Sequence, residues 1–205
     1  MMISPETFYE ERLKKRTKEE VLVVIDELKT QIAKLKNDIE KSNYFEKELL
    51  TQPSEDVQII MNREYLEHAK TAFAEAGGEY NPSIMELADQ RFNANIQNIT
   101  KIEFEKGYFV GPRDKKTFSV SEMADTDKEM FLDALKDLHL GEWRKNYSSD
   151  DYGVCILDGE FWDLKISFSN GQTPATFHGD NAYPYNFDRF LEVIEDNFDV
   201  LFRLS

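Results

Sequence analysis

The chain has 205 residues, and its 40% hydrophobic and 13% aromatic content supplies enough apolar material for one large domain or two small ones. Its 40 acidic and 25 basic residues give a formal net charge of −15, and a field of that sign repels nucleic acid and anionic lipid. No segment approaches the roughly 18 apolar residues of a membrane span, the first residues lack the pattern of a signal peptide, and the single cysteine, Cys155, excludes an internal disulfide. The sequence therefore predicts a cytoplasmic protein that contacts neither membrane nor nucleic acid directly.

The first half of the chain predicts helices. Ser4-Pro5 favours a helix start, and Thr17 with Glu20 forms a capping box at the start of a long helix. Apolar residues then recur at intervals of four and three, the pattern of a coiled coil or helical hairpin: Val21, Ile25, Leu28, Ile32, Leu35 and Ile39. Two further helices are predicted over residues 55–76 and 83–93.

Strand patterns begin after Asn98. Strands are predicted around residues 99–109 and 117–120, and a helix over 127–138. Three strands over 152–157, 161–168 and 172–177 follow, joined by turns at Asp158-Gly159 and Asn170-Gly171, before a final helix from about Asn186. The predicted fold class is α+β, with a helical hairpin or bundle over residues 1–97 and an antiparallel β-meander packed with helices over 98–205.

Chemical motifs are few. His68, His139 and His178 have no second histidine or cysteine at zinc-ligand spacing, and no phosphate-binding or dinucleotide-binding glycine motif is present. We therefore predict no catalytic residue, metal or cofactor. A metal-dependent hydrolase remains an alternative, because several carboxylates gather near one predicted hairpin: Asp150, Asp151, Asp158, Glu160 and Asp163.

Several segments resemble an uncharacterised protein family encoded on mobile elements of gut Firmicutes: Ile3–Tyr9, Glu64–Lys70, Leu157–Gly159, Trp162–Leu164, Phe168–Gly171 and Gly179–Phe187. The resemblance implies an anti-defence protein, such as an anti-CRISPR inhibitor. In that role, an acidic surface would occupy the basic nucleic-acid channel of a CRISPR effector nuclease, with carboxylates in place of phosphates.

For this acidic binding protein, the candidate partner-binding residues lie in the C-terminal half: Asp151, Asp158, Glu160, Asp163, Asp180, Tyr183 and Tyr185. A second hypothesis is a regulatory or assembly protein of a mobile element that dimerises, or binds a partner helix, through Ile25, Leu28, Ile32 and Leu35. Packing of that seam within the chain is the competing interpretation, since a second long helix follows directly.

Overall fold

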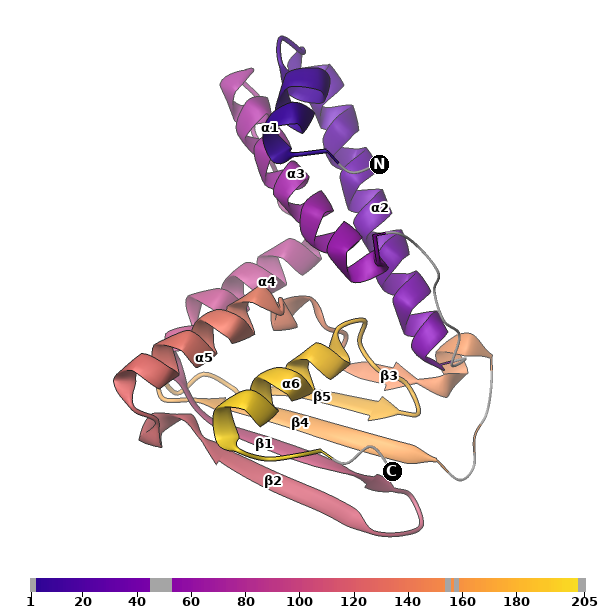
Figure 1. The fold of residues 1–205 in the computed structure, drawn as a ribbon, viewed down its shortest axis with the longest axis vertical. Coiled ribbons are helices and arrows are strands. Elements are labelled where there is room, and N and C mark those ends of the chain that lie inside the picture. The colour runs from indigo at the N-terminus through magenta and orange to yellow at the C-terminus, as the bar shows by residue number, and fades with distance from the viewer. Residues whose placement is uncertain (1–2, 45–52, 154–155, 157–158, 203–205) are drawn as a thin grey trace. The chain divides into compact units, whose positions relative to one another are not determined.

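A computed structural model describes residues 3–44, 53–153, 156 and 159–202 (Figure 1). The chain divides into two compact units, Met1–Asn81 and Pro82–Ser205. The first is helical and the second combines helices with a β-sheet, so the protein has the predicted α+β fold. Within the described ranges, no helix is both long enough and apolar enough to cross a lipid bilayer.

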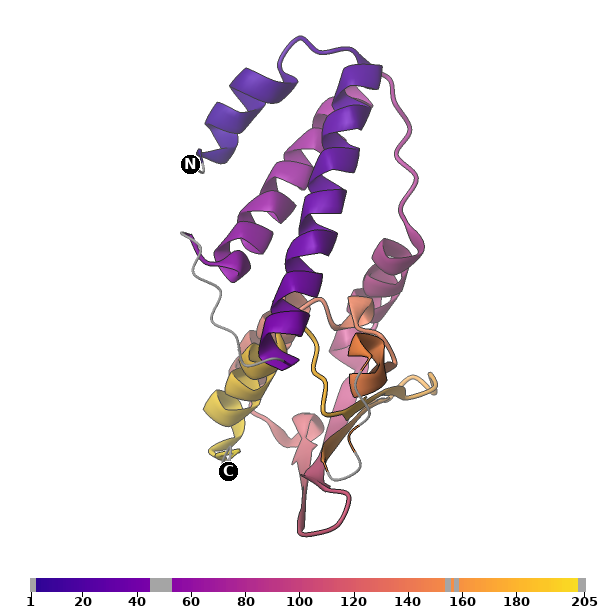
Figure 2. The same ribbon diagram turned by 90° about the vertical axis from the view of Figure 1, so that its right-hand side faces the viewer.

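The helical unit is built around an antiparallel pair, α2 (Lys18–Tyr44) and α3 (Glu55–Glu75) (Figure 2). The short helix α1 (Pro5–Phe8) and the π-helical turn η1 (Tyr9–Leu13) precede the pair and pack against α3. The predicted capping box is present at the start of α2: the Thr17 amide donates to Glu20 Oε2 at 2.9 Å, and the Glu20 amide donates to Thr17 Oγ1 at 3.3 Å. These reciprocal bonds satisfy amides that the first helical turn leaves without partners.

The apolar seam of α2 is buried inside this unit. Val21, Ile25, Leu28, Ile32 and Ile39 are each no more than 8% exposed, whereas Leu35 is half-buried. The seam therefore contributes to the core of its own hairpin through packing against α3. Binding of a partner helix through Ile25, Leu28, Ile32 and Leu35 would require the hairpin to open.

The second unit contains a sheet with strand order β2-β1-β4-β5-β3. Four strands pair antiparallel, namely β1 (Ile99–Tyr108), β2 (Arg113–Ser119), β4 (Glu160–Phe168) and β5 (Ala175–Asp180), and β3 (Asn146–Ser148) lies parallel to β5. The alternation predicted for residues 161–168 is confirmed, because Trp162 and Leu164 are buried while Asp163 is exposed. One face of the sheet is therefore apolar and the other polar.

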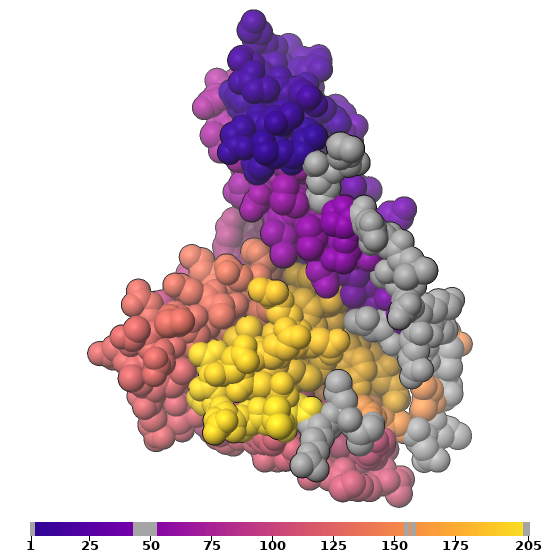
Figure 3. Space-filling model, in the orientation of Figure 1, coloured from indigo at the N-terminus to yellow at the C-terminus, as the bar shows by residue number. Residues whose placement is uncertain are grey.

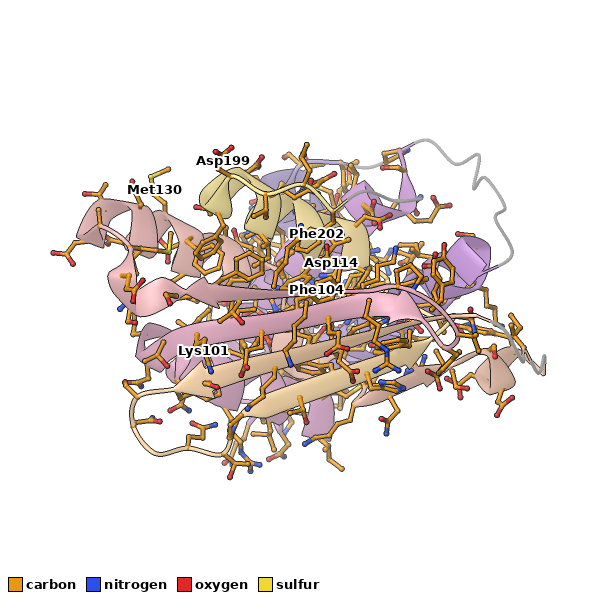
Figure 4. All side chains as sticks on the ribbon, turned by 90° about the horizontal axis from the view of Figure 1, so that it is seen from below. Lys101, Phe104, Asp114, Met130, Asp199 and Phe202 are labelled. Carbon is orange, nitrogen blue, oxygen red and sulfur yellow. The ribbon has the colours of Figure 1, made fainter. Side chains whose placement is uncertain are left out.

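Helices α5 (Asp125–Asp137) and α6 (Phe187–Phe198) cover the apolar face, with α4 (Ile84–Ala94) beside α5 (Figure 1). Figure 4 shows Phe104 and Phe202 between the sheet and the helices and Lys101 on the opposite face of the sheet. Trp162, fully buried, donates its indole N–H to the Ala182 carbonyl at 2.9 Å. Short 3-10 turns connect these elements: η2 (Ile96–Asn98), η3 (Val120–Glu122), η4 (Leu140–Glu142) and η5 (Ser149–Tyr152).

The strands predicted over residues 117–120, 152–157 and 172–177 differ from the structure, in which the first of them is β2 over Arg113–Ser119. Tyr152 ends η5 instead of starting a strand, and the rest of the predicted strand 152–157 lies largely outside the described residues. The predicted turn at Asp158-Gly159 would pair residues 152–157 with β4. In the structure the neighbour of β4 on the side away from β5 is β1, and Phe104 lies opposite Leu164. β5 begins at Ala175, directly after Pro174, because proline cannot donate a hydrogen bond to the strand ladder.

The division between the units also differs from the boundary predicted after residue 97. Phe92 of α4 and Ile96 of η2 belong to the hydrophobic core of the second unit. The chain therefore divides after Asn81, before α4, although the strand pattern in the sequence begins only at Ile99.

Candidate functional site

The polar face of the sheet carries charges of both signs in nearly equal number. Glu103 lies 3.2 Å from Lys101 Nζ and 3.3 Å from Lys165 Nζ, and these two cations hold the pKa of Glu103 below its ordinary value. Glu105 lies 3.7 Å from Arg113 and 3.6 Å from Lys115. The carboxylates on β1 are thus neutralised by basic side chains of the same face.

Two of the predicted binding residues, Asp163 and Asp180, meet at His178. The His178 Nδ1 atom lies 2.8 Å from Asp163 Oδ1, and its Nε2 atom lies 2.9 Å from Asp180 Oδ1. Burial lowers the pKa of His178, but the hydrogen bond to Asp163 and the charge of Asp180 outweigh burial and raise the pKa above the ordinary 6.5. Both ring nitrogens can donate only when the imidazole is protonated, so this arrangement favours the imidazolium ion.

Glu160 and Tyr183 also meet, on the other side of the sheet. Tyr183 donates its hydroxyl hydrogen to Glu160 Oε2 at 2.9 Å, and Lys106 Nζ lies 3.2 Å from the same oxygen. Burial raises the pKa of Glu160, but the hydrogen bond from Tyr183 and the charge of Lys106 lower it by more. The pKa of Glu160 therefore lies below its ordinary value. Burial and the Glu160 charge raise the pKa of the Tyr183 phenol. Since side chains alternate along a strand, Glu160 and Asp163 project to opposite faces.

The other predicted binding residues lie apart from these pairs. Asp151 accepts a hydrogen bond from Arg144 Nη1 at 2.7 Å and caps η5 through the Ser148 amide. Tyr185 is half-buried, and Asp158 lies outside the described residues. The predicted residues that the structure describes therefore form several separate groups, each with at least one polar or cationic partner, instead of one outward acidic face.

A regularly spaced set of exposed acidic residues lies on α5 and α6, where the sequence analysis did not place the site. On α5, Asp125, Glu129, Asp133 and Asp137 recur at every fourth position and are all exposed. On α6, Asp188, Glu192 and Asp196 do the same. The two helices pack against each other and lie side by side in Figure 3. None of these seven carboxylates, here called the acidic rows, forms an ion pair with another residue in the described part of the chain.

Residues four apart lie about one turn from each other on the same helix face, with a rise of roughly 6 Å between them. The acidic rows are therefore two stripes of regularly spaced negative charge on neighbouring helices. In Figure 4, Met130 of α5 and Asp199, which directly follows α6, lie on the side of these helices away from the sheet. The acidic rows are visible in the sequence as carboxylates repeated at every fourth position. They lie outside the hairpin segments that contain the predicted binding residues.

A second cluster joins α4 to η4. Asp89, His139 and Glu142 each offer a ligand atom, and these atoms lie within 4.8 Å of one another. His139 Nδ1 lies 2.7 Å from Asp89 Oδ2, which also accepts a hydrogen bond from Asn93 Nδ2 at 3.1 Å. Asp89 is 8% exposed, and its Oδ1 atom has no hydrogen-bond partner among the described residues. This is the one group of three potential metal ligands within the described ranges.

Local backbone geometry brings this cluster together. His139 has φ 51° in the left-handed region and precedes η4, so that His139 and Glu142, three residues apart, lie on one side of the 3-10 turn. Asp89 and Asn93, four residues apart, share one face of α4. Gly141 allows the close approach of the two elements, because a Cβ atom there would lie 2.4 Å from Asp89 Cα. In the sequence, His139 has no second histidine or cysteine at zinc-ligand spacing, and the carboxylate partners of His139 are not visible in that spacing.

No protein-family model, curated protein or solved structure matches the chain.

Proposed function

We propose that the protein is a non-catalytic acidic binding protein that docks on a basic, nucleic-acid-binding surface of another protein. The binding surface consists of the acidic rows of α5 and α6. The partner class is a nucleic-acid-handling protein such as an RNA-guided CRISPR effector nuclease, which the resemblance to proteins of mobile elements favours. An array of fixed carboxylates attracts such a surface in the way that phosphates do.

The observation that supports this proposal is the spacing of the acidic rows. Like charges four residues apart destabilise a helix by about 0.2–0.5 kcal/mol per pair, and the rows contain five such pairs, Asp125 to Asp137 on α5 and Asp188 to Asp196 on α6. Carboxylates near a helix C-terminus, such as Asp137, are also unfavourable for the helix dipole. Asp125 and Asp188 lie in first turns, where the helix dipole favours a carboxylate. The repulsion between the other row residues opposes helix stability, whereas Glu103 and Glu105 on the sheet face are balanced by cations.

Electrostatics also favours the rows over the residues chosen from the sequence. Of those residues, Asp151 and Glu160 already have cationic partners within 4 Å, and Asp163 and Asp180 both contact His178. A basic partner would have to displace those contacts. The carboxylates of the rows have no such competitor among the described residues, so they retain their full attraction for an incoming cation. Basic side chains on the two helices are few: Lys128, Lys136 and Arg189.

The test compares two variants with the same change in charge. In the row variant, Glu129→Gln, Asp133→Asn, Glu192→Gln and Asp196→Asn remove four charges from α5 and α6. In the control variant, Glu19→Gln, Glu64→Gln, Glu75→Gln and Glu79→Gln remove four exposed charges from the helical unit. Both proteins then carry a formal net charge of −11 instead of −15.

The assay measures how each protein competes with target DNA for a purified, guide-loaded RNA-guided nuclease. The wild type and the control variant should displace DNA, while the row variant should do so about 10-fold to 100-fold less well, and raising salt from about 0.05 M to about 0.3 M should weaken wild-type binding steeply. Equal competition by the row and control variants would contradict the proposal, as would wild-type binding that salt leaves unchanged.

A further inference from the structure

We infer that Asp89, His139 and Glu142 form a binding site for a divalent transition-metal ion, with Zn²⁺ as the ion that the donor set fits best. The three residues lie within the second unit and come from two elements, the helix α4 and the 3-10 turn η4. The site is separate from the acidic rows and does not depend on the proposed function.

The three donor atoms are close enough together to share one ion. One atom from each of the three residues lies within 4.8 Å of the other two, which is close enough for one ion to bind all three after small side-chain movements. Metal–oxygen and metal–nitrogen bonds to Zn²⁺ are about 2.0–2.2 Å long, so ligand atoms around one ion lie about 3–4 Å apart.

One carboxylate oxygen of the cluster lacks a hydrogen-bond donor among the described residues. Asp89 Oδ1 is buried and accepts no hydrogen bond from any described residue, although Asp89 itself is 8% exposed. The Oδ1 atom of the neighbouring Asn93 is likewise buried and has no partner among those residues. A buried carboxylate oxygen without a partner carries a large free-energy cost. Because such an oxygen can only accept, a bound cation would remove that cost.

The mixture of nitrogen and oxygen donors determines which ion fits the site best. An imidazole nitrogen favours Zn²⁺ and other first-row transition metals, whereas Mg²⁺ and Ca²⁺ favour sites made only of oxygen ligands. Three protein ligands leave at least one coordination position for water. The ion would link α4 to η4, two elements that already pack closely at Gly141.

The Asp163–His178–Asp180 group provides a matched internal control. It also places a histidine between carboxylates, but both ring nitrogens of His178 are hydrogen-bonded, whereas His139 is bonded through Nδ1. Neither Asp163 nor Asp180 has a buried oxygen without a partner among the described residues. These side chains are also more exposed, with 53% for Asp163 against 11% for Asp89. We therefore expect Zn²⁺ to bind at His139 and not at His178.

The experiment measures Zn²⁺ binding to the metal-stripped full-length chain by competition with a chromophoric chelator. Three variants are compared with the wild type: Asp89→Asn, His139→Asn and His178→Asn. Asparagine has nearly the shape of aspartate and tolerates the left-handed backbone of residue 139. Tryptophan fluorescence, from Trp143 directly after Glu142 and from Trp162, provides a second readout of binding and shows whether each variant is folded.

We expect one Zn²⁺ per chain, a preference for Zn²⁺ over Mg²⁺, and affinity lowered at least about 10-fold to 100-fold in D89N and H139N. H178N should bind as the wild type does. Zn²⁺ should also raise the midpoint of thermal unfolding of the wild type but not of H139N. The inference is overturned if the wild type binds no Zn²⁺ above the level of H139N, or if only H178N loses binding.

Discussion

Replacing Gly141 by alanine tests the packing of α4 against η4, on which the metal-ligand cluster depends. The added Cβ atom would lie 2.4 Å from Asp89 Cα, 2.7 Å from the Ala88 carbonyl oxygen and 2.8 Å from the Asp89 amide nitrogen. All three are backbone atoms of a helix, which cannot rotate away as a side chain can. The clash must therefore separate α4 from η4.

Overpacking of this kind costs about 1–3 kcal/mol, and contact with a rigid backbone places G141A toward the upper end, at about 2–3 kcal/mol. For a unit of this size, such a loss lowers the midpoint of thermal unfolding by roughly 6–15 °C. Zn²⁺ affinity should fall as well, because Asp89 would move away from His139 and Glu142.

The assay is unfolding in guanidinium chloride followed by tryptophan fluorescence. The chain has two tryptophans, Trp143 and Trp162, and both are buried in the second unit, so the signal reports that unit. The control is Gly171→Ala. Gly171 has φ 77° and no atom within 4 Å of the position of a Cβ atom. This substitution should lower the free energy of unfolding by about 1 kcal/mol, because alanine is strained in the left-handed conformation. A G141A protein as stable as the wild type would refute the described contact between α4 and η4.

Three further predictions concern the core and the charged pairs. Ile25→Ala, at a position 1% exposed, should lower the stability of the helical unit by about 2–5 kcal/mol; helical circular dichroism during urea unfolding measures this, and an unchanged midpoint would contradict burial of the seam. Tyr183→Phe removes the hydroxyl donor to Glu160 and should cost about 1–2 kcal/mol, whereas a neutral effect would show that the bond contributes nothing. Because the pKa of His178 is raised in the fold, its stabilising contribution is complete below about pH 6.5 and is lost as pH rises through the raised pKa. The difference in unfolding midpoint between wild type and His178→Asn should therefore shrink from about pH 5.5 to about pH 8.5; a difference independent of pH would contradict the pairing.

The local features of the fold were predictable because they depend on neighbours in sequence. The capping boxes at Thr17 and Ser83 follow from residues three apart, and the seam of α2 follows from the spacing of its apolar residues. The pairing of β4 with β1 was not predictable in this way. It joins segments about sixty residues apart, and the choice depends on which partner buries Trp162 and Leu164 best under α6.

The candidate site illustrates the same distinction. The acidic rows can be read from the sequence once α5 and α6 are known to be helices, because a spacing of four places carboxylates on one face. Whether those charges are matched by cations depends on the tertiary structure, which pairs Asp163 with His178 and Asp151 with Arg144. The Asp89–His139 contact spans fifty residues and depends on a glycine whose role is visible only when α4 lies against η4.

The most direct test of the acidic rows as a binding surface is a nuclear magnetic resonance titration of the isotopically labelled chain with a short lysine-rich and arginine-rich peptide. The account predicts that amide shifts change along α5 and α6, around Glu129, Asp133 and Glu192, and that these changes disappear in the row variant and at high salt. Shift changes concentrated on the polar face of the sheet, or spread evenly over both units, would contradict it.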